Sequence, residues 1–150
     1  MRNPYLVAGG WLSLAASALH AACILGGPDW YRFFGAGEAM AAAAERGEAY
    51  PALVTAVIAL ILALWAAYAF AGAKLIRRLP LMRTALVAIS AIYLLRGAAL
   101  IPALTVPGIG GAFNIWSSLI VLICGLCYAV GTWKAWPSLS QRKIVNALDA

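Results

Sequence analysis

The chain has 150 residues, of which 65% are hydrophobic and only 11% are charged, and its formal net charge is +6. Soluble domains carry about 25% charged residues, so a chain this apolar cannot cover its own surface with polar side chains in water. The composition excludes an ordinary soluble domain. It predicts one integral membrane domain over residues 1–150.

Four segments are long and apolar enough to cross a bilayer, since a helix needs about twenty apolar residues to span a hydrocarbon layer of ~30 Å. We place these spans at about residues 5–25, 52–72, 84–103 and 113–133. The first resembles a secretory signal around Ala16, Ser17 and Ala18, but its apolar run continues to Leu25, so we expect it to be retained. Short connections predict an all-α fold, an up-down bundle of four transmembrane helices.

The basic residues gather on one side of the predicted membrane. Between the second and third spans and after the fourth lie Lys74, Arg77, Arg78, Arg83, Lys134, Arg142 and Lys143. The first loop instead carries most of the carboxylates: Asp29, Glu38, Glu45 and Glu48. The positive-inside rule therefore predicts a protein of the plasma (inner) membrane with both termini cytoplasmic. Anionic lipid headgroups account for the positive charge, and we expect no nucleic-acid partner.

The first, outer loop is too long for a simple connection. Phe33, Phe34 and Met40 fall at helical spacing on one side, while Glu38 and Glu45 share another. This pattern predicts a short amphipathic helix over about residues 30–46. Such a helix would lie on the outer membrane surface or cover the mouth of the bundle.

Ionisable residues occur at similar depth inside two predicted spans. Arg96 lies about two turns before the outer end of the third span, and His20 just over one turn before the outer end of the first. Ser17, Tyr93 and Asn114 add polar groups on three different spans. A charge within the bilayer is costly and normally faces the interior of a bundle. The sequence therefore predicts one polar binding site in the outer half.

Glu38 is the expected partner of Arg96, with Asp29 or Glu45 as the second choice. We also assign Trp30 and Trp116 to the predicted binding site. Two alternatives remain for Arg96: it extends outward to water or a lipid headgroup, or it only ties the loop helix down through an ion pair.

Three functions fit this site. The first is the binding or carrying of a lipid-like or amphipathic small molecule, with Arg96 holding an anionic or carbonyl group. The second is an enzyme of the isomerase type acting on an apolar substrate, with His20 and Glu38 transferring protons. The third is a structural subunit. We expect no cofactor and no metal, because the chain has one histidine and lacks nucleotide-binding fingerprints.

Cys124 and Cys127 form a C-x-x-C pair in a four-span protein. This pair resembles the DsbB and vitamin K epoxide reductase group, whose members pass electrons between thiols and a quinone. That group places its pair near the outer surface and uses further loop cysteines. Here the pair lies near mid-membrane and the outward loops contain no cysteine, so we expect reduced packing residues.

Small residues recur every fourth position on the first span, at Gly9, Ser13, Ser17 and Ala21. Such a series lets helix backbones approach closely. We favour packing within one chain, and the alternatives are a homodimer or a larger membrane complex.

Overall fold

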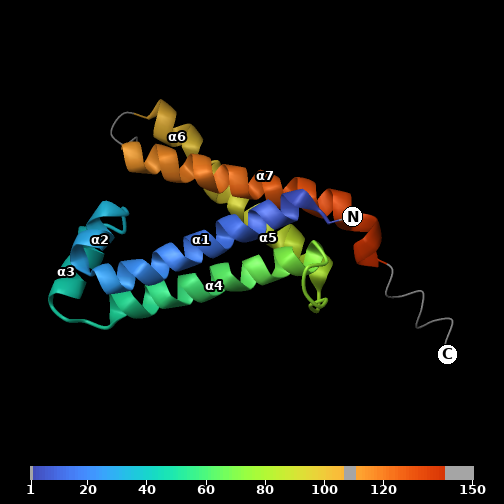
Figure 1. Cartoon of the computed structure of the whole chain (residues 1–150). Helices are drawn as coiled ribbons and strands as arrows, with labels where there is room; N and C mark the ends of the chain where they lie inside the picture. The colour runs from blue at the N-terminus through green and yellow to red at the C-terminus, as the bar shows by residue number, and fades with distance from the viewer. Residues whose placement is uncertain (1, 107–110, 141–150) are drawn as a thin grey trace.

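The computed structural model describes residues 2–106 and 111–140, and over these residues the chain is helical and has no strands (Figure 1). Four of its helical segments are long and apolar enough to cross a membrane. This confirms the prediction of an all-α fold with four long apolar helices. The helices are α1 (Pro4–Gly26), α2 (Pro28–Phe33), α3 (Glu38–Glu45), α4 (Tyr50–Gly72), α5 (Met82–Gly97), α6 (Leu100–Thr105) and α7 (Ala112–Ser140).

The long helices pack as two pairs, α1 with α4 and α5 with α7 (Figure 1). The pairs meet mainly where α1 contacts α7. We call the end that holds residues 2–4, the 73–81 connection and the last turn of α7 the basic end, and the end that holds α2, α3 and α6 the loop end. The ribbons of the two pairs lie close near the basic end and separate toward the loop end (Figure 1).

Glycines allow the close contact between the pairs. A Cβ added to Gly131 of α7 would lie 2.7 Å from the Leu6 side chain of α1, and one added to Gly9 would lie 2.9 Å from the Tyr128 ring. Leu6 and Tyr128 are both fully buried in the main core cluster. Gly9 of α1 and Gly131 of α7 therefore let these two helices approach closely within one chain.

The third predicted span contains a break that its periodicity does not reveal. α5 ends at Gly97 and α6 begins at Leu100, where one helix was expected over 84–103. Pro102 has no N–H for the carbonyl of Ala98, which instead accepts from Ile101 at 3.0 Å. The chain therefore tightens into a turn before a short second helix.

The first loop contains two short helices in place of the one expected over residues 30–46. α2 and α3 are separated by Gly35 and Gly37, whose φ angles are 69° and 92°. Left-handed φ values are readily adopted by glycine and end a helix. The expectation of a continuous amphipathic helix was wrong because the two glycines outweigh the apolar spacing around them.

The fourth long helix continues beyond its predicted end at residue 133 and passes through Pro137 to Ser140. Two arginines from the start of α5 and the connection before it reach its last turns. Arg78 donates to the carbonyl of Leu139, and Arg83 donates to that of Trp136 at 3.4 Å. These hydrogen bonds hold residues 136–139 of α7 against the start of α5 and the connection before it.

Candidate functional site

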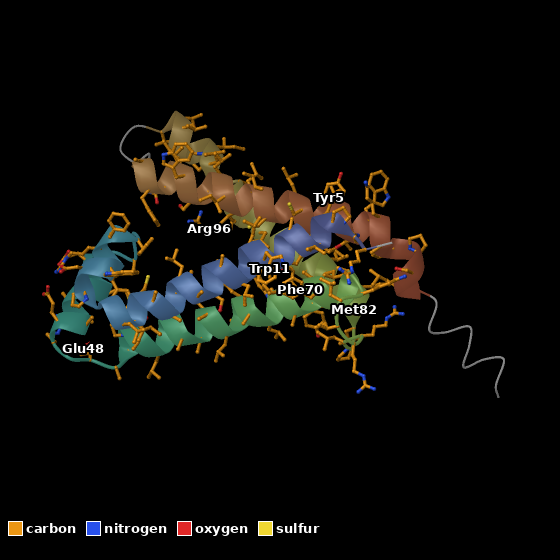
Figure 2. The ribbon with its side chains drawn as sticks, in the orientation of Figure 1. Tyr5, Trp11, Glu48, Phe70, Met82 and Arg96 are labelled. Carbon is orange, nitrogen blue, oxygen red and sulfur yellow. The ribbon has the colours of Figure 1, made fainter. Side chains whose placement is uncertain are left out.

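Arg96 lies in the last turn of α5, and its side chain projects between α7 and α1 in the view of Figure 2. Its Nη1 donates to the hydroxyl of Ser118 on α7 at 3.1 Å. Ser118 is only 2% exposed, whereas Arg96 itself is exposed. The hydrogen bond therefore fixes one side of the guanidinium to α7 and leaves its other donors accessible.

The expected ion pair between Arg96 and Glu38 is not formed. Both carboxylate oxygens of Glu38 accept from Arg32, from Nε at 2.9 Å and from Nη2 at 2.7 Å. Arg32 also lies 2.8 Å from a carboxylate oxygen of Glu45 and 3.5 Å from one of Asp29. The turn between α2 and α3 brings these acidic groups around Arg32, which is much nearer to them in the chain than Arg96 is.

Each carboxylate in the described part of the chain is thus paired within the loop end, since Glu48 pairs with Arg46 at 2.6 Å. The hydrogen bonds from Arg32 lower the pKa of Glu38 below its usual value. The pKa of Arg32 is raised, mainly by its hydrogen bond to Glu38 and next by its hydrogen bond to Glu45. Among the described residues, no carboxylate lies within 4.0 Å of the Arg96 guanidinium. Within the described part of the chain, the hydrogen-bond partner of the Arg96 guanidinium is the neutral oxygen of Ser118.

Two of the predicted site residues, Ser17 and His20, lie on α1 and bond to α4 or within their own helix. Ser17 donates to the carbonyl of Ala59 on α4 at 2.7 Å. His20 uses Nδ1 to contact the carbonyl of Ala16, one turn earlier in α1, at 2.8 Å. The structure therefore shows no hydrogen bond between these two side chains and Arg96 within the described residues.

Tyr93 belongs to a separate buried cluster of hydroxyl groups. Its Oη lies 2.8 Å from the Oγ of Ser13, which lies 2.9 Å from the Oη of Tyr128. Tyr128 in turn donates to the carbonyl of Trp65 at 2.9 Å. Because each hydroxyl has one proton, Ser13 must donate to Tyr128 and Tyr93 must donate to Ser13. This hydroxyl chain joins the four long helices in the order α5, α1, α7, α4.

The remaining predicted binding residues lie at the loop end. Trp30 is 41% exposed, and its ring centroid lies 5.7 Å from that of Phe34. Trp116 is exposed, as is Asn114 in the first turn of α7. The ring of Phe34 also contacts that of Phe113 at 6.4 Å. The first loop therefore touches the start of α7, about one and a half turns before the Ser118 that bonds to Arg96.

The three cysteines carry free thiols, and Cys124 is buried in the main core cluster beside the hydroxyl chain. Cys23 is buried with Tyr31 and Ala41 of the first loop. Cys124 and the partly buried Cys127 lie one turn apart on α7. The role of these thiols in packing stays a prediction.

Two residues gained importance only in the structure. Tyr128 is the middle of the hydroxyl chain, and its sequence signal was a tyrosine well inside an apolar span. Arg32 pairs with three acidic residues of the first loop, and its signal was an isolated arginine with carboxylates on both sides. In comparisons with known proteins, no protein-family model, curated protein or solved structure matches this chain.

Proposed function

We propose that the chain is an integral membrane protein, an up-down bundle of four spans, that binds an amphipathic molecule through an anionic or carbonyl group at Arg96. The observation that carries this proposal is the unneutralised guanidinium of Arg96, which bonds to Ser118 and has no carboxylate within 4.0 Å among the described residues. A charge held in an apolar span is costly without a counter-charge. A bound anionic headgroup would supply one.

The outward faces of the long helices support insertion in a membrane. Large apolar side chains are exposed along α4, α5 and α7, including Leu60, Leu64, Leu95 and Ile120, which are 53–75% exposed. Exposed apolar surface of this extent is matched by lipid tails and not by water. It also gives the hydrocarbon chain of a bound amphiphile a surface to lie against.

The depth of Arg96 suits a lipid-like ligand. Ser118 lies six residues into α7, which is about 9 Å along the helix axis. With a hydrocarbon layer of ~30 Å, this position is in the outer part of the apolar layer next to the loop end. An amphiphile could reach Arg96 with its polar group while its chain remains among the lipid tails.

Sidedness in the proposal follows the basic residues: the basic end faces the cytoplasm and the loop end faces outward across the plasma (inner) membrane. Single cysteines at Ala39 of α3 and at Ile76, both exposed, can be placed in a variant without native cysteines. On intact cells, a membrane-impermeant maleimide should label position 39 and leave position 76 unmodified. Labelling of position 76 alone would invert the orientation.

The ligand proposal is tested with two probes that share an apolar chain, oleate and oleyl alcohol. The purified protein should prefer oleate, and Arg96→Gln should weaken oleate binding by roughly tenfold to a hundredfold, the value of a charge-assisted hydrogen bond. Arg96→Lys should recover only part of the affinity, because an ammonium lacks the planar donors. Arg46→Gln, which removes a loop-end cation away from α5, is the control with the same charge change.

Binding can be followed by native mass spectrometry of the protein in a neutral detergent. Equal oleate retention by wild-type protein and Arg96→Gln would refute the proposed site. Equal losses in Arg96→Gln and Arg46→Gln would show that only general charge matters. Melting temperatures of all variants show whether a loss of binding accompanies a loss of fold.

A further inference from the structure

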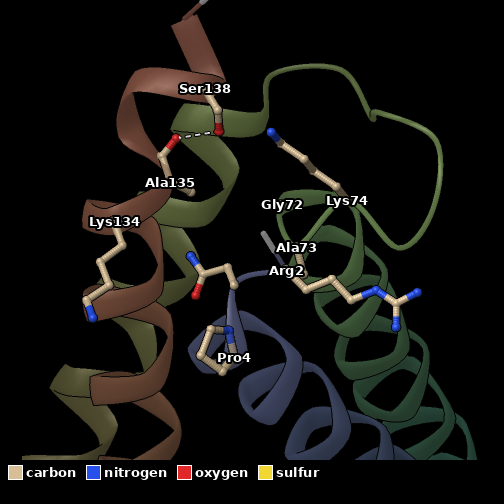
Figure 3. A pocket seen from close by; sticks show the side chains of 9 residues that line it. Arg2, Pro4, Gly72, Ala73, Lys74, Lys134, Ala135 and Ser138 are labelled. Carbon is tan, nitrogen blue, oxygen red and sulfur yellow. Dashed lines mark hydrogen bonds between the residues drawn. The ribbon is translucent and has the colours of Figure 1, made fainter.

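A pocket of about 360 Å³ lies at the basic end (Figure 3). Arg96 lies toward the other end of the long helices. Its walls come from the start of α1, the end of α4 and the last turns of α7. Three cationic side chains line it, and none of its lining residues is acidic. The lining residues are Arg2, Asn3, Pro4, Gly72, Ala73, Lys74, Lys134, Ala135 and Ser138.

Lys74 is the cation that reaches across this pocket. Figure 3 shows its side chain extending from the end of α4 toward Ser138 on α7. Among the described residues, the Lys74 ammonium has no hydrogen bond and no ion pair, and the residue is exposed. The other two cations flank the pocket, and the ammonium of Lys134 lies 4.5 Å from the centroid of the Tyr5 ring. Lys74 is therefore free to meet an anion.

The backbone of Lys74 is also unusual. Its φ is 62°, and it occupies the left-handed position that follows α4, where Leu75 donates to the carbonyl of Phe70 and Lys74 to that of Ala71. The same hydrogen-bond pattern ends α2 and α3, and there glycines, Gly35 and Gly47, fill the corresponding position. A side chain is strained at this position and glycine is not. Strain retained at one residue is consistent with a use for its side chain.

The remaining walls are suited to a negative group. The N-terminus of α1 opens onto the pocket at Pro4 and adds the positive end of its helix dipole. The amide of Asn3 is already used, because it donates to the carbonyl of Gly131 at 2.7 Å and accepts from the backbone N–H of Leu6. Asn3 therefore fixes the start of α1 against α7 and holds the pocket in shape.

We propose that this pocket binds a phosphate group, with the Lys74 ammonium as its direct ligand and Arg2 and Lys134 supplying further positive charge. A phosphate is the anion that matches a pocket with one cation reaching into it, further cations on its walls and a helix N-terminus. Two sources share this chemistry, the headgroup of an anionic phospholipid and a soluble phosphate ester. The site is separate from the one proposed at Arg96 and does not depend on it.

The decisive variant is Lys74→Gly, because it removes the cation and relieves the backbone strain at once. Its melting temperature should equal or exceed that of the wild-type protein. Its affinity for phosphatidylglycerol, measured by native mass spectrometry in a neutral detergent, should fall about fivefold, the value of one lysine at a lipid surface. Arg77→Gln is the matched control, because Arg77 is exposed in the same connection but does not line the pocket.

The expected control result is a change of less than twofold in phosphatidylglycerol binding for Arg77→Gln. Similar losses in both variants, or no loss in Lys74→Gly, would overturn the proposal. The source of the phosphate group is identified by comparing phosphatidylglycerol with phosphatidylcholine and by competition with glycerol 3-phosphate. Preference for phosphatidylglycerol that glycerol 3-phosphate cannot displace assigns a lipid headgroup, whereas displacement by glycerol 3-phosphate at a similar concentration assigns a soluble phosphate ester.

Discussion

Replacing Ser13 by alanine tests the hydroxyl chain most directly, because Ser13 is fully buried and bonds to two tyrosines on different helices. Without its oxygen, the Tyr93 hydroxyl loses its acceptor and Tyr128 loses a donor. An orphaned buried donor costs about 1 to 3 kcal/mol, and hydrogen bonds between membrane helices average about 0.6 kcal/mol with a maximum near 1.7. We expect Ser13→Ala to lower the free energy of unfolding by about 1 to 2 kcal/mol.

Tyr93→Phe should cost less, about 0.5 to 1 kcal/mol, because Ser13 keeps its bond to Tyr128 and no donor is orphaned. The double variant should be more stable than the sum of the single losses predicts, since removal of Tyr93 Oη also removes the orphaned group. Ser90→Ala is the matched control. Ser90 is equally a buried serine, but its hydroxyl donates only to Leu86 of its own helix, at 2.7 Å.

The assay is reversible unfolding in mixed detergent micelles, followed by circular dichroism and repeated for each variant. Ser90→Ala should lose less than about 0.5 kcal/mol, because a hydroxyl bonded to its own helix adds little to helix association. Equal losses for Ser13→Ala and Ser90→Ala would refute the assigned role of Ser13. Strict additivity of Ser13→Ala and Tyr93→Phe would refute the hydrogen bond between these residues, and a loss for Tyr93→Phe as large as that for Ser13→Ala would refute its assigned direction.

Two further predictions concern packing and pH. Gly97→Ala should destabilise the protein by about 1 to 3 kcal/mol, because the new Cβ would lie 2.7 Å from the backbone Cα of Leu122. Gly111→Ala is the control in the same unfolding assay, because nothing lies within 4 Å of its added Cβ. The pKa of Glu38 is lowered in the folded protein by Arg32. The pair therefore stabilises the loop at pH values above the unfolded-state pKa of about 4.3. This stabilisation is lost as the pH falls through the lower folded-state pKa. Hydrogen exchange over residues 28–45, corrected for intrinsic rates, should show protection at pH 7 that declines below about pH 4; unchanged protection down to pH 2 would contradict the assigned pair.

The long helices could be predicted from sequence because hydropathy over about twenty residues depends on composition alone. The position of Arg96 near one end of a long apolar helix could be predicted for the same reason. Its surroundings could not, since they depend on contacts between distant segments: Arg96 meets Ser118 across 22 positions, and Ser13 meets Tyr128 across 115.

The error over Glu38 arose from local geometry. A continuous helix over residues 30–46 would place Glu38 on a face with Glu45 and leave it free to reach α5. The left-handed turn at Gly35 and Gly37 instead folds α3 back toward α2, so Arg32 meets Glu38. Two glycines separated by one residue were visible in the sequence. Their ability to adopt a left-handed φ outweighs the apolar spacing of a loop.

The direction of the hydroxyl chain bears on proton movement across the protein. A file of hydroxyls passes a proton only if every member can afterwards turn and donate the other way. Here the last acceptor is the backbone carbonyl of Trp65, which has no proton to return, and the Tyr128 hydroxyl remains directed at it. The hydroxyl chain joins four helices and ends on a carbonyl that has no proton to exchange, so we expect it to fix helix positions and not to conduct protons.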